Sequence, residues 1–216
     1  MSVTKANADV LDLTDAYAFS GTVTGTNAGG LVFIATTNLA AAGTDVSSMD
    51  FTGLTADYDT YMIRVSDMHP TADNTAFYMR LGDSSGMDSG ASDYAWGYNG
   101  DNFNDATHDK QALCDNADGQ IAVGAGPSFV GAVGNATGEG ISTTIWLNHG
   151  RNNDMAPTVS FLTATMGDSG LTGQGTSYTV GGGSRLAEID VDRVSFFFAS
   201  GSIVSGRISI YGLSNS

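Results

Sequence analysis

The residues best able to do chemistry in this chain are aromatic rings and oxygen-bearing side chains gathered in one short stretch. Flat aromatic faces can cover sugar rings, and carboxylate and carboxamide oxygens can accept hydrogen bonds from sugar hydroxyls. This combination predicts a receptor contact for a neutral glycan on an exposed loop. The residues expected to form it are Tyr94, Trp96, Tyr98, Asp101, Asn102 and Asn104. The alternative is structural, with Trp96 filling one end of the fold.

Catalysis is not indicated by any motif of the chain. His69, His108 and His149 lie beside turn residues, and no Gly-x-Ser-x-Gly nucleophile elbow accompanies them. The glycine-rich segments lack both the third glycine of a dinucleotide loop and a following Gly-Lys-Ser/Thr. Carboxylates are abundant enough for a glycosidase, but the chain is short for an enzyme that degrades polysaccharides along a groove. We therefore expect no enzymatic activity and no catalytic residues.

Two acidic segments are candidate calcium sites, Asp101–Asp105 and Asp115–Gly119. Both concentrate the oxygen ligands that calcium prefers, but neither supplies the terminal bidentate Glu of an EF-hand loop. Asp and Asn are also ordinary turn residues, and this interpretation is the favoured one. We therefore predict no metal site and no cofactor, with calcium as the alternative.

The charge of the chain argues against two classes of partner. Its 23 acidic residues outnumber its 8 basic ones and give a formal net charge of −15. Such a surface repels phosphate backbones and anionic lipids, so we expect neither nucleic-acid binding nor membrane insertion. Solubility is the simplest role for this acidity, and divalent-cation binding is the alternative.

The cysteine content and the first residues indicate the cellular context. Cys114 is the only cysteine, so no intramolecular disulfide can form, and we expect a buried, unreactive thiol. That suits folding in a reducing cytoplasm. The first residues do not resemble a signal peptide, and no apolar run is long enough for a transmembrane helix. We expect synthesis in the cytoplasm without a secretion signal.

Short alternating segments predict an all-β fold. Residues 60–65 place Tyr61, Ile63 and Val65 on one face, the period of two that marks a half-buried strand. Further strands are expected at residues 76–81, 120–123, 141–147, 158–165, 186–191, 194–199 and 207–211. Without helical periodicity, this predicts an antiparallel β-sandwich of jelly-roll type over residues 46–216. Residues 82–118 and 166–184 are expected to be long loops.

Residues 1–45 differ from the remainder and are predicted to form an extended arm. They alternate loosely, contain a Thr/Gly-rich spacer and include one short buried strand at residues 31–35. This segment has too little apolar surface to fold alone. It is expected either to contact another molecule, as an intersubunit or anchoring arm, or to join the main sheet.

Three segments carry a resemblance to a known family. The chain ends in two β-rich runs around a Ser/Gly bend and closes with Tyr211-Gly212. Residues 51–61 join a Gly-Leu turn to a Tyr-Asp pair, and residues 78–86 precede the Ser92-Asp93-Tyr94 segment. Together these segments resemble β-modules of tailed-bacteriophage virion proteins, especially tail-fibre and other surface-appendage proteins.

The resemblance implies a non-enzymatic structural virion protein on the exterior of the particle, involved in host-surface attachment. Capsid decoration, as a cement or head-fibre protein, is the alternative, and a carbohydrate-binding, lectin-like module is a further one. With the arm, the resemblance also implies a homo-oligomer, with a trimer favoured. Residues 1–45 would then contact other virion proteins. The family provides no catalytic residues to carry over.

Overall fold

The protein is all-β, as the sequence predicts. The computed structural model describes residues 30–39, 44–102, 109–124, 132–148, 155–167 and 175–213. None of these residues is helical, so the described part of the chain also holds no helix that could cross a membrane. All strand pairs are antiparallel, and the strands form two sheets.

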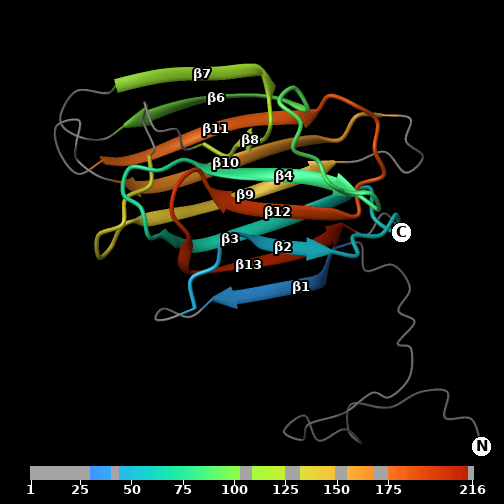
Figure 1. The fold of residues 1–216 in the computed structure, drawn as a ribbon, viewed down its shortest axis with the longest axis horizontal. Coiled ribbons are helices and arrows are strands. Elements are labelled where there is room, and N and C mark those ends of the chain that lie inside the picture. Colours follow the sequence, from blue (N-terminus) through green and yellow to red (C-terminus); the bar gives the residue numbers. More distant parts are fainter. Residues whose placement is uncertain are drawn as a thin grey trace, which may run out of the picture.

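The larger sheet has eight strands. From edge to edge they are β1 (Leu31–Leu39), β13 (Ile203–Leu213), β3 (Thr60–Pro70), β9 (Gly140–Asn148), β10 (Thr158–Gly167), β11 (Gly175–Arg185), β6 (Tyr94–Asn102) and β7 (Asp109–Asp118). Three of them, β9, β10 and β11, are consecutive in the sequence and pair in that order, as a meander. The smaller sheet has five strands. They are β2 (Met49–Thr52), β12 (Arg193–Phe198), β4 (Phe77–Asp83) and β5 (Gly86–Met87), with β8 (Ile121–Ala122) also paired to β4. Figure 1 shows β2, β12 and β4 in front of β13, β3 and β9.

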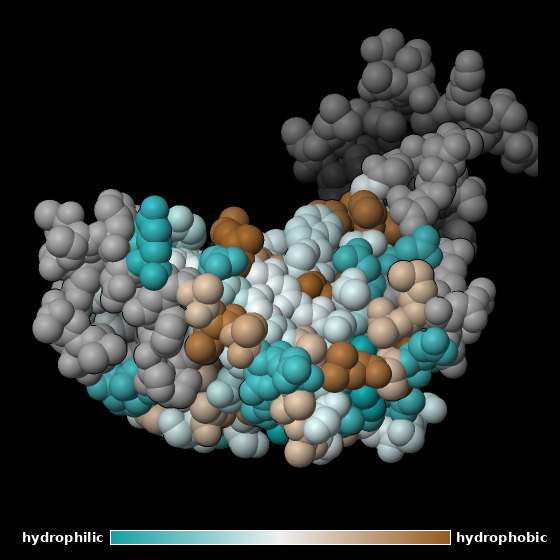
Figure 2. Space-filling model, turned by 90° about the horizontal axis from the view of Figure 1, so that it is seen from above, coloured by the Kyte–Doolittle hydropathy of each residue, from teal (hydrophilic) through white to brown (hydrophobic). Residues whose placement is uncertain are grey.

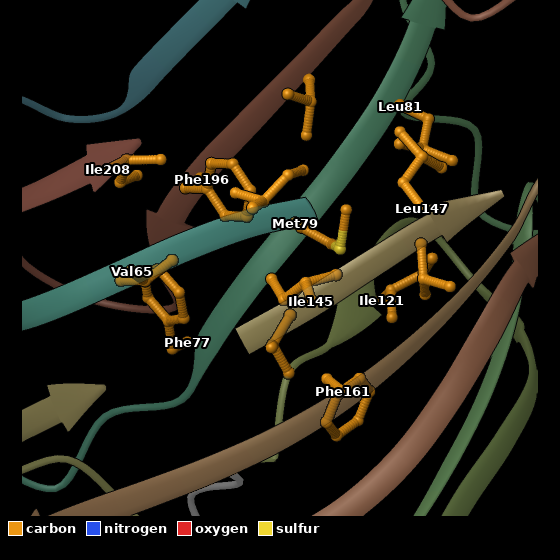
Figure 3. Packing of buried hydrophobic residues seen from close by; sticks show 14 of the residues in the cluster. Val65, Phe77, Met79, Leu81, Ile121, Ile145, Leu147, Phe161, Phe196 and Ile208 are labelled. Atoms are coloured by element: carbon orange, nitrogen blue, oxygen red, sulfur yellow. The ribbon is translucent and has the colours of Figure 1, made fainter. Parts of the chain in front are cut away.

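The core lies between the two sheets because one face of each strand is apolar. In β3, Tyr61, Ile63 and Val65 are fully buried, and the residues between them are not. Phe77, Met79 and Leu81 of β4 and Phe196 of β12 meet side chains of the larger sheet there (Figure 3). Burying one such side chain stabilises the fold by about 1.5–3 kcal/mol relative to leaving it in water. Two antiparallel sheets packed face to face make a β-sandwich.

Most predicted strands are confirmed, and one is wrong. The segments expected from residue 60, 76, 141, 158, 194 and 207 coincide with β3, β4, β9, β10, β12 and β13. Residues 186–191 form no strand, because the backbone of this segment bonds to a loop, with the Leu186 amide donating to the Asp93 carbonyl at 2.7 Å. Sheets of eight and five strands also differ from a simple eight-stranded jelly roll, so that finer description is not confirmed.

Both expected long loops contain strands instead. Residues 82–118 include β5, β6 and β7, and residues 166–184 include most of β11. The glycines of β11 are required by close packing rather than by a turn. A Cβ atom on Gly181 would lie 2.6 Å from Phe161 Cζ and 2.5 Å from Tyr98 Cβ. The absence of a side chain at Gly181 therefore leaves room for Tyr98 and Phe161 of the neighbouring strands to pack over the β11 backbone.

Part of the predicted arm belongs to the larger sheet. β1 pairs with β13 from Leu31↔Leu213 to Leu39↔Gly206, which is longer than the strand expected at residues 31–35. The expectation of a buried strand is wrong, because β1 is an edge and its Phe33 side chain is 57% exposed. Residues 31–39 thus join the main sheet, and contact of the predicted arm with another molecule stays a prediction. Residues 1–29 lie outside the described part of the chain.

Candidate functional site

The aromatic residues predicted to form an exposed receptor contact lie in strand β6, not in a loop. Tyr94 and Tyr98 are 0% and 3% exposed. Trp96 is partly buried against the core, its Nε1 donates to an Asp118 carboxylate oxygen at 2.9 Å, and its ring stacks on Tyr98 with centroids 5.6 Å apart. The predicted exposure is therefore wrong for Tyr94 and Tyr98, whereas Trp96 is partly exposed and borders an open hollow. The packing of Trp96 against the core agrees with the structural alternative.

The alternation of β6 explains this orientation. Tyr94, Trp96 and Tyr98 occupy every second position of the strand, so they share the face that meets the smaller sheet. Burial raises the pKa of Tyr98 to about 12. Burial, opposed by the backbone hydrogen bond to Leu81, also holds the pKa of Tyr94 far above its usual value. Both hydroxyls are therefore neutral groups of the interior.

The polar residues of the predicted contact have different outcomes. Asp101 lies in β6 and is only 6% exposed, at the border of an open hollow of about 510 Å³. Tyr178 and Val180 of β11 and Lys110 of β7 also line this hollow. Asn104 and the side chain of Asn102 lie outside the described residues. The structure thus brings Asp101 to a surface hollow, away from the buried aromatic rings.

A different set of aromatic and apolar residues is presented on the outer face of the larger sheet. The strand register places Trp146 opposite Met62, Met62 opposite Tyr211, and Tyr211 opposite Phe33. We call these four residues the apolar row. The rings of Phe33 and Tyr211 touch edge to face, with centroids 5.8 Å apart. The row crosses β9, β3, β13 and β1 at one level of the sheet.

The apolar row is available to solvent. Phe33 is exposed, the other three side chains are partly exposed, and none of the four belongs to the core between the sheets. Polar groups flank it in the neighbouring levels. Thr60 Oγ1 donates to Asn148 Oδ1 at 3.0 Å on one side, and Arg64 donates to Thr144 Oγ1 at 2.8 Å on the other. Aromatic faces therefore lie between hydroxyl, amide and guanidinium groups.

Beyond Trp146 the same level continues into small residues. Ser160, Gly182 and Gly97 follow in register and leave the backbone without large side chains. An open hollow of about 740 Å³ lies here, lined also by Cys114 and Asp115 of β7. Figure 2 looks onto the β7 side of the molecule and shows a pale hollowed surface with separate apolar patches. The apolar row thus leads toward a shallow depression.

Cys114 corrects another expectation from the sequence. Its thiol was predicted to be buried, but Cys114 is exposed. The physical reason is its position on β7, an edge strand of the larger sheet, opposite Gly97. The prediction of a buried thiol assumed that a lone cysteine occupies the core.

The residues weighed for metal or catalytic chemistry mostly have structural partners. Asp115 accepts a hydrogen bond from the Ala117 amide at 2.9 Å, and Asp118 accepts one from the Gly119 amide at 2.6 Å. Residues 115–118 belong to β7 and not to a separate turn, and these contacts are local ones at the end of the strand, where its register with β6 shifts. Most of residues 101–105, and both His108 and His149, lie outside the described chain. No group of three or more His, Cys, Asp or Glu side chains that could hold a metal ion occurs among the described residues.

The sequence contained a signal for Trp146 that reasoning from composition missed. Ile145 and Leu147 were expected in a strand, and both are fully buried. A residue between two buried neighbours must point to the opposite face. Applied to Trp146, this rule selects it as the outward tryptophan, whereas Trp96 was selected from the acidic and aromatic composition of its surroundings.

No protein-family model matches this chain, and no similar protein is found among the curated proteins or the solved structures.

Proposed function

We propose that this chain is a non-enzymatic structural protein on the exterior of a tailed-phage virion, where it helps a tail fibre or appendage attach to the host surface. The proposal is supported by the resemblance of its β-strand segments to virion appendage modules. A rigid two-sheet protein with a large exposed sheet face suits an attachment role, because rigid elements hold binding groups in place.

The apolar row on the outer face is the observation that carries this proposal. Phe33, Tyr211 and Trp146 provide aromatic surface in one line across the sheet, with polar groups on both sides. Aromatic surface bordered by hydrogen-bonding groups suits a neutral glycan. The net charge of −15 disfavours a strongly anionic polysaccharide. The proposed receptor is therefore a neutral glycan chain lying along the row.

The direct test is binding of the labelled protein to an array of immobilised bacterial polysaccharides, both neutral and anionic. Trp146→Ala should weaken binding to a neutral polysaccharide by tenfold or more, about 1.4 kcal/mol. Leu186→Ala is the matched control, because Leu186 is 50% exposed and lies outside the larger sheet. Binding that is confined to anionic polysaccharides, or that survives Trp146→Ala, would contradict this site.

Capsid decoration is the second candidate. It is favoured by the exposed strand β1, which directly follows the N-terminal segment and could anchor it against capsid subunits. Immunogold electron microscopy of intact particles separates the two functions. Labels on the tail or its fibres support attachment, whereas labels spread over the capsid lattice would overturn the first proposal in favour of decoration.

A further inference from the structure

The edges of the two sheets differ in how well they are protected. An edge strand presents unpaired backbone N–H and C=O groups, which proteins commonly protect by shortness or charge. Within the described chain, the smaller sheet ends in β2, which has four residues, and in the two-residue strands β5 and β8. One end of the larger sheet is β7, which carries Lys110, Asp115 and Asp118. All of these edges are short or charged.

The other end of the larger sheet, β1, has neither protection. It is nine residues long and contains no charged residue. In the sequence, no charged residue lies between Asp15 and Asp45, although the whole chain has a net charge of −15. Among the described strands, only β13 pairs with β1. The most neutral part of an acidic protein is therefore an edge open to pairing.

The first side chains of β1 are both apolar and exposed. Leu31, Val32 and Phe33 are 47%, 41% and 57% exposed. Successive residues of a strand point to opposite faces, so this apolar surface occurs on both faces of the edge. A strand placed beside β1 would cover both.

We propose that β1 pairs antiparallel with β1 of a second copy of this chain and joins the two larger sheets into one. A free edge is completed by another free edge, and among the described edges only β1 is both long and uncharged. The complement of β1 is therefore β1 itself, which makes the contact two-fold. Two molecules of like charge also approach with least repulsion where neither carries charge.

The register follows from a bulge in β1. The pairing with β13 shifts between Phe33 and Ala35, so the regular part of the strand before the shift is residues 31–33, and all three are apolar. A two-fold contact centred on Val32 pairs only residues 31–33 of the two β1 strands, with Leu31 of one copy opposite Phe33 of the other, and cross-strand apolar pairs of this kind stabilise sheets. The contact is a dimer, in place of the trimer expected from the sequence.

Sedimentation equilibrium of the full-length chain over a range of concentrations tests this contact. The wild-type chain should have the mass of two protomers. Val32→Lys places a charge in the centre of the proposed contact and should raise the dissociation constant of the dimer at least tenfold, which shifts the measured mass toward that of a single protomer. Val32 lies outside the apolar row, so the variant leaves the proposed glycan site intact. Leu162→Lys is the matched control, because Leu162 is 58% exposed on β10 in the middle of the same sheet.

Other outcomes would overturn the proposal. A wild-type chain that stays a single protomer, a mass of three protomers, or a dimer unaffected by Val32→Lys would each contradict β1 pairing. Deletion of residues 1–28 tests the chain's own N-terminal segment as the occupant. If the full chain is monomeric and the deletion variant associates, that segment covers β1 and the two-fold contact is wrong. Circular dichroism establishes that each variant keeps its β-sheet spectrum before its mass is interpreted.

Discussion

The hydroxyl of Tyr94 in β6 bonds both backbone groups of Leu81 in β4. It accepts a hydrogen bond from the Leu81 amide at 2.9 Å and lies 2.8 Å from the Leu81 carbonyl oxygen, to which it donates. Leu81 lies between the part of β4 that pairs with β8 and the part that pairs with β5. One side chain of the larger sheet therefore completes the edge of the smaller sheet and ties the two sheets together.

Tyr94→Phe should destabilise the protein while keeping its fold. The change keeps the ring but removes the acceptor for the buried Leu81 amide, and such an unsatisfied group costs about 1–3 kcal/mol. Urea unfolding measures the loss. Tyr211→Phe is the control, because the Tyr211 ring is partly exposed on the outer face, and its change should stay within about 0.5 kcal/mol. Equal losses in the free energy of unfolding for the two variants would show that the Tyr94–Leu81 hydrogen bonds stabilise the protein no more than a partly exposed hydroxyl does.

Gly181→Ala should destabilise the sandwich by about 1–3 kcal/mol, the usual cost of overpacking a core. The new methyl group would lie within 2.6 Å of Gly97 O, Tyr98 Cβ and Phe161 Cζ. Because backbone and two core residues surround it, no single side-chain rotation removes the clash. Thermal unfolding followed by circular dichroism gives the shift. Val180→Ala, at an adjacent position whose side chain is 53% exposed, should have a small effect. An unchanged melting temperature for Gly181→Ala would contradict the close packing of β10, β11 and β6.

How much of this fold follows from the sequence depends on the strand. β3 and β9 are recognisable because most of their alternate residues are apolar, with Thr143 the exception in β9, and a one-sided apolar pattern is what a half-buried strand requires. β11 was missed because Gly181, Gly182 and Gly183 read as a flexible loop. Their role depends on Phe161 and Tyr98, which lie far away in the sequence. Such long-range packing has no local signature.

The candidate site illustrates the same limit. Whether Trp96 or Trp146 faces solvent depends on which face of each strand the smaller sheet covers. For Trp146, the flanking apolar residues Ile145 and Leu147, which are both buried, predict from the sequence that Trp146 points outward. For Trp96, the alternating partners Tyr94 and Tyr98 are amphipathic, so the pattern alone leaves their direction open.

Stability should fall as the solution becomes strongly alkaline. Burial raises the folded-state pKa of Tyr98 to about 12, and burial also raises the pKa of Tyr61, Tyr78 and Tyr94. The unfolded chain ionises its tyrosines near pH ~10, so the folded state holds more protons above that pH. The stabilisation is therefore complete below pH ~10 and is lost as the pH rises toward ~12.

Urea unfolding at increasing pH, together with near-ultraviolet absorbance of tyrosinate, checks this dependence. The free energy of unfolding should decrease through the alkaline window, and part of the tyrosinate signal should appear only when the protein unfolds. Tyr98→Phe should make the decrease shallower, because it removes one of the shifted groups. A constant stability across the window, or complete ionisation of all tyrosines in the folded state, would contradict the burial of these rings.

Replacement by alanine should cost much more stability at Trp96 than at Trp146. Trp96→Ala removes the stack on Tyr98 and the hydrogen bond to Asp118, so it should cost stability at the lower end of the about 3–5 kcal/mol typical for buried aromatic residues. Trp146→Ala truncates an outward side chain and should change stability by less than about 1 kcal/mol. Urea unfolding measures both variants. If Trp96→Ala were neutral and Trp146→Ala strongly destabilising, the outward face of the larger sheet would be misassigned, and with it the apolar row as a binding surface.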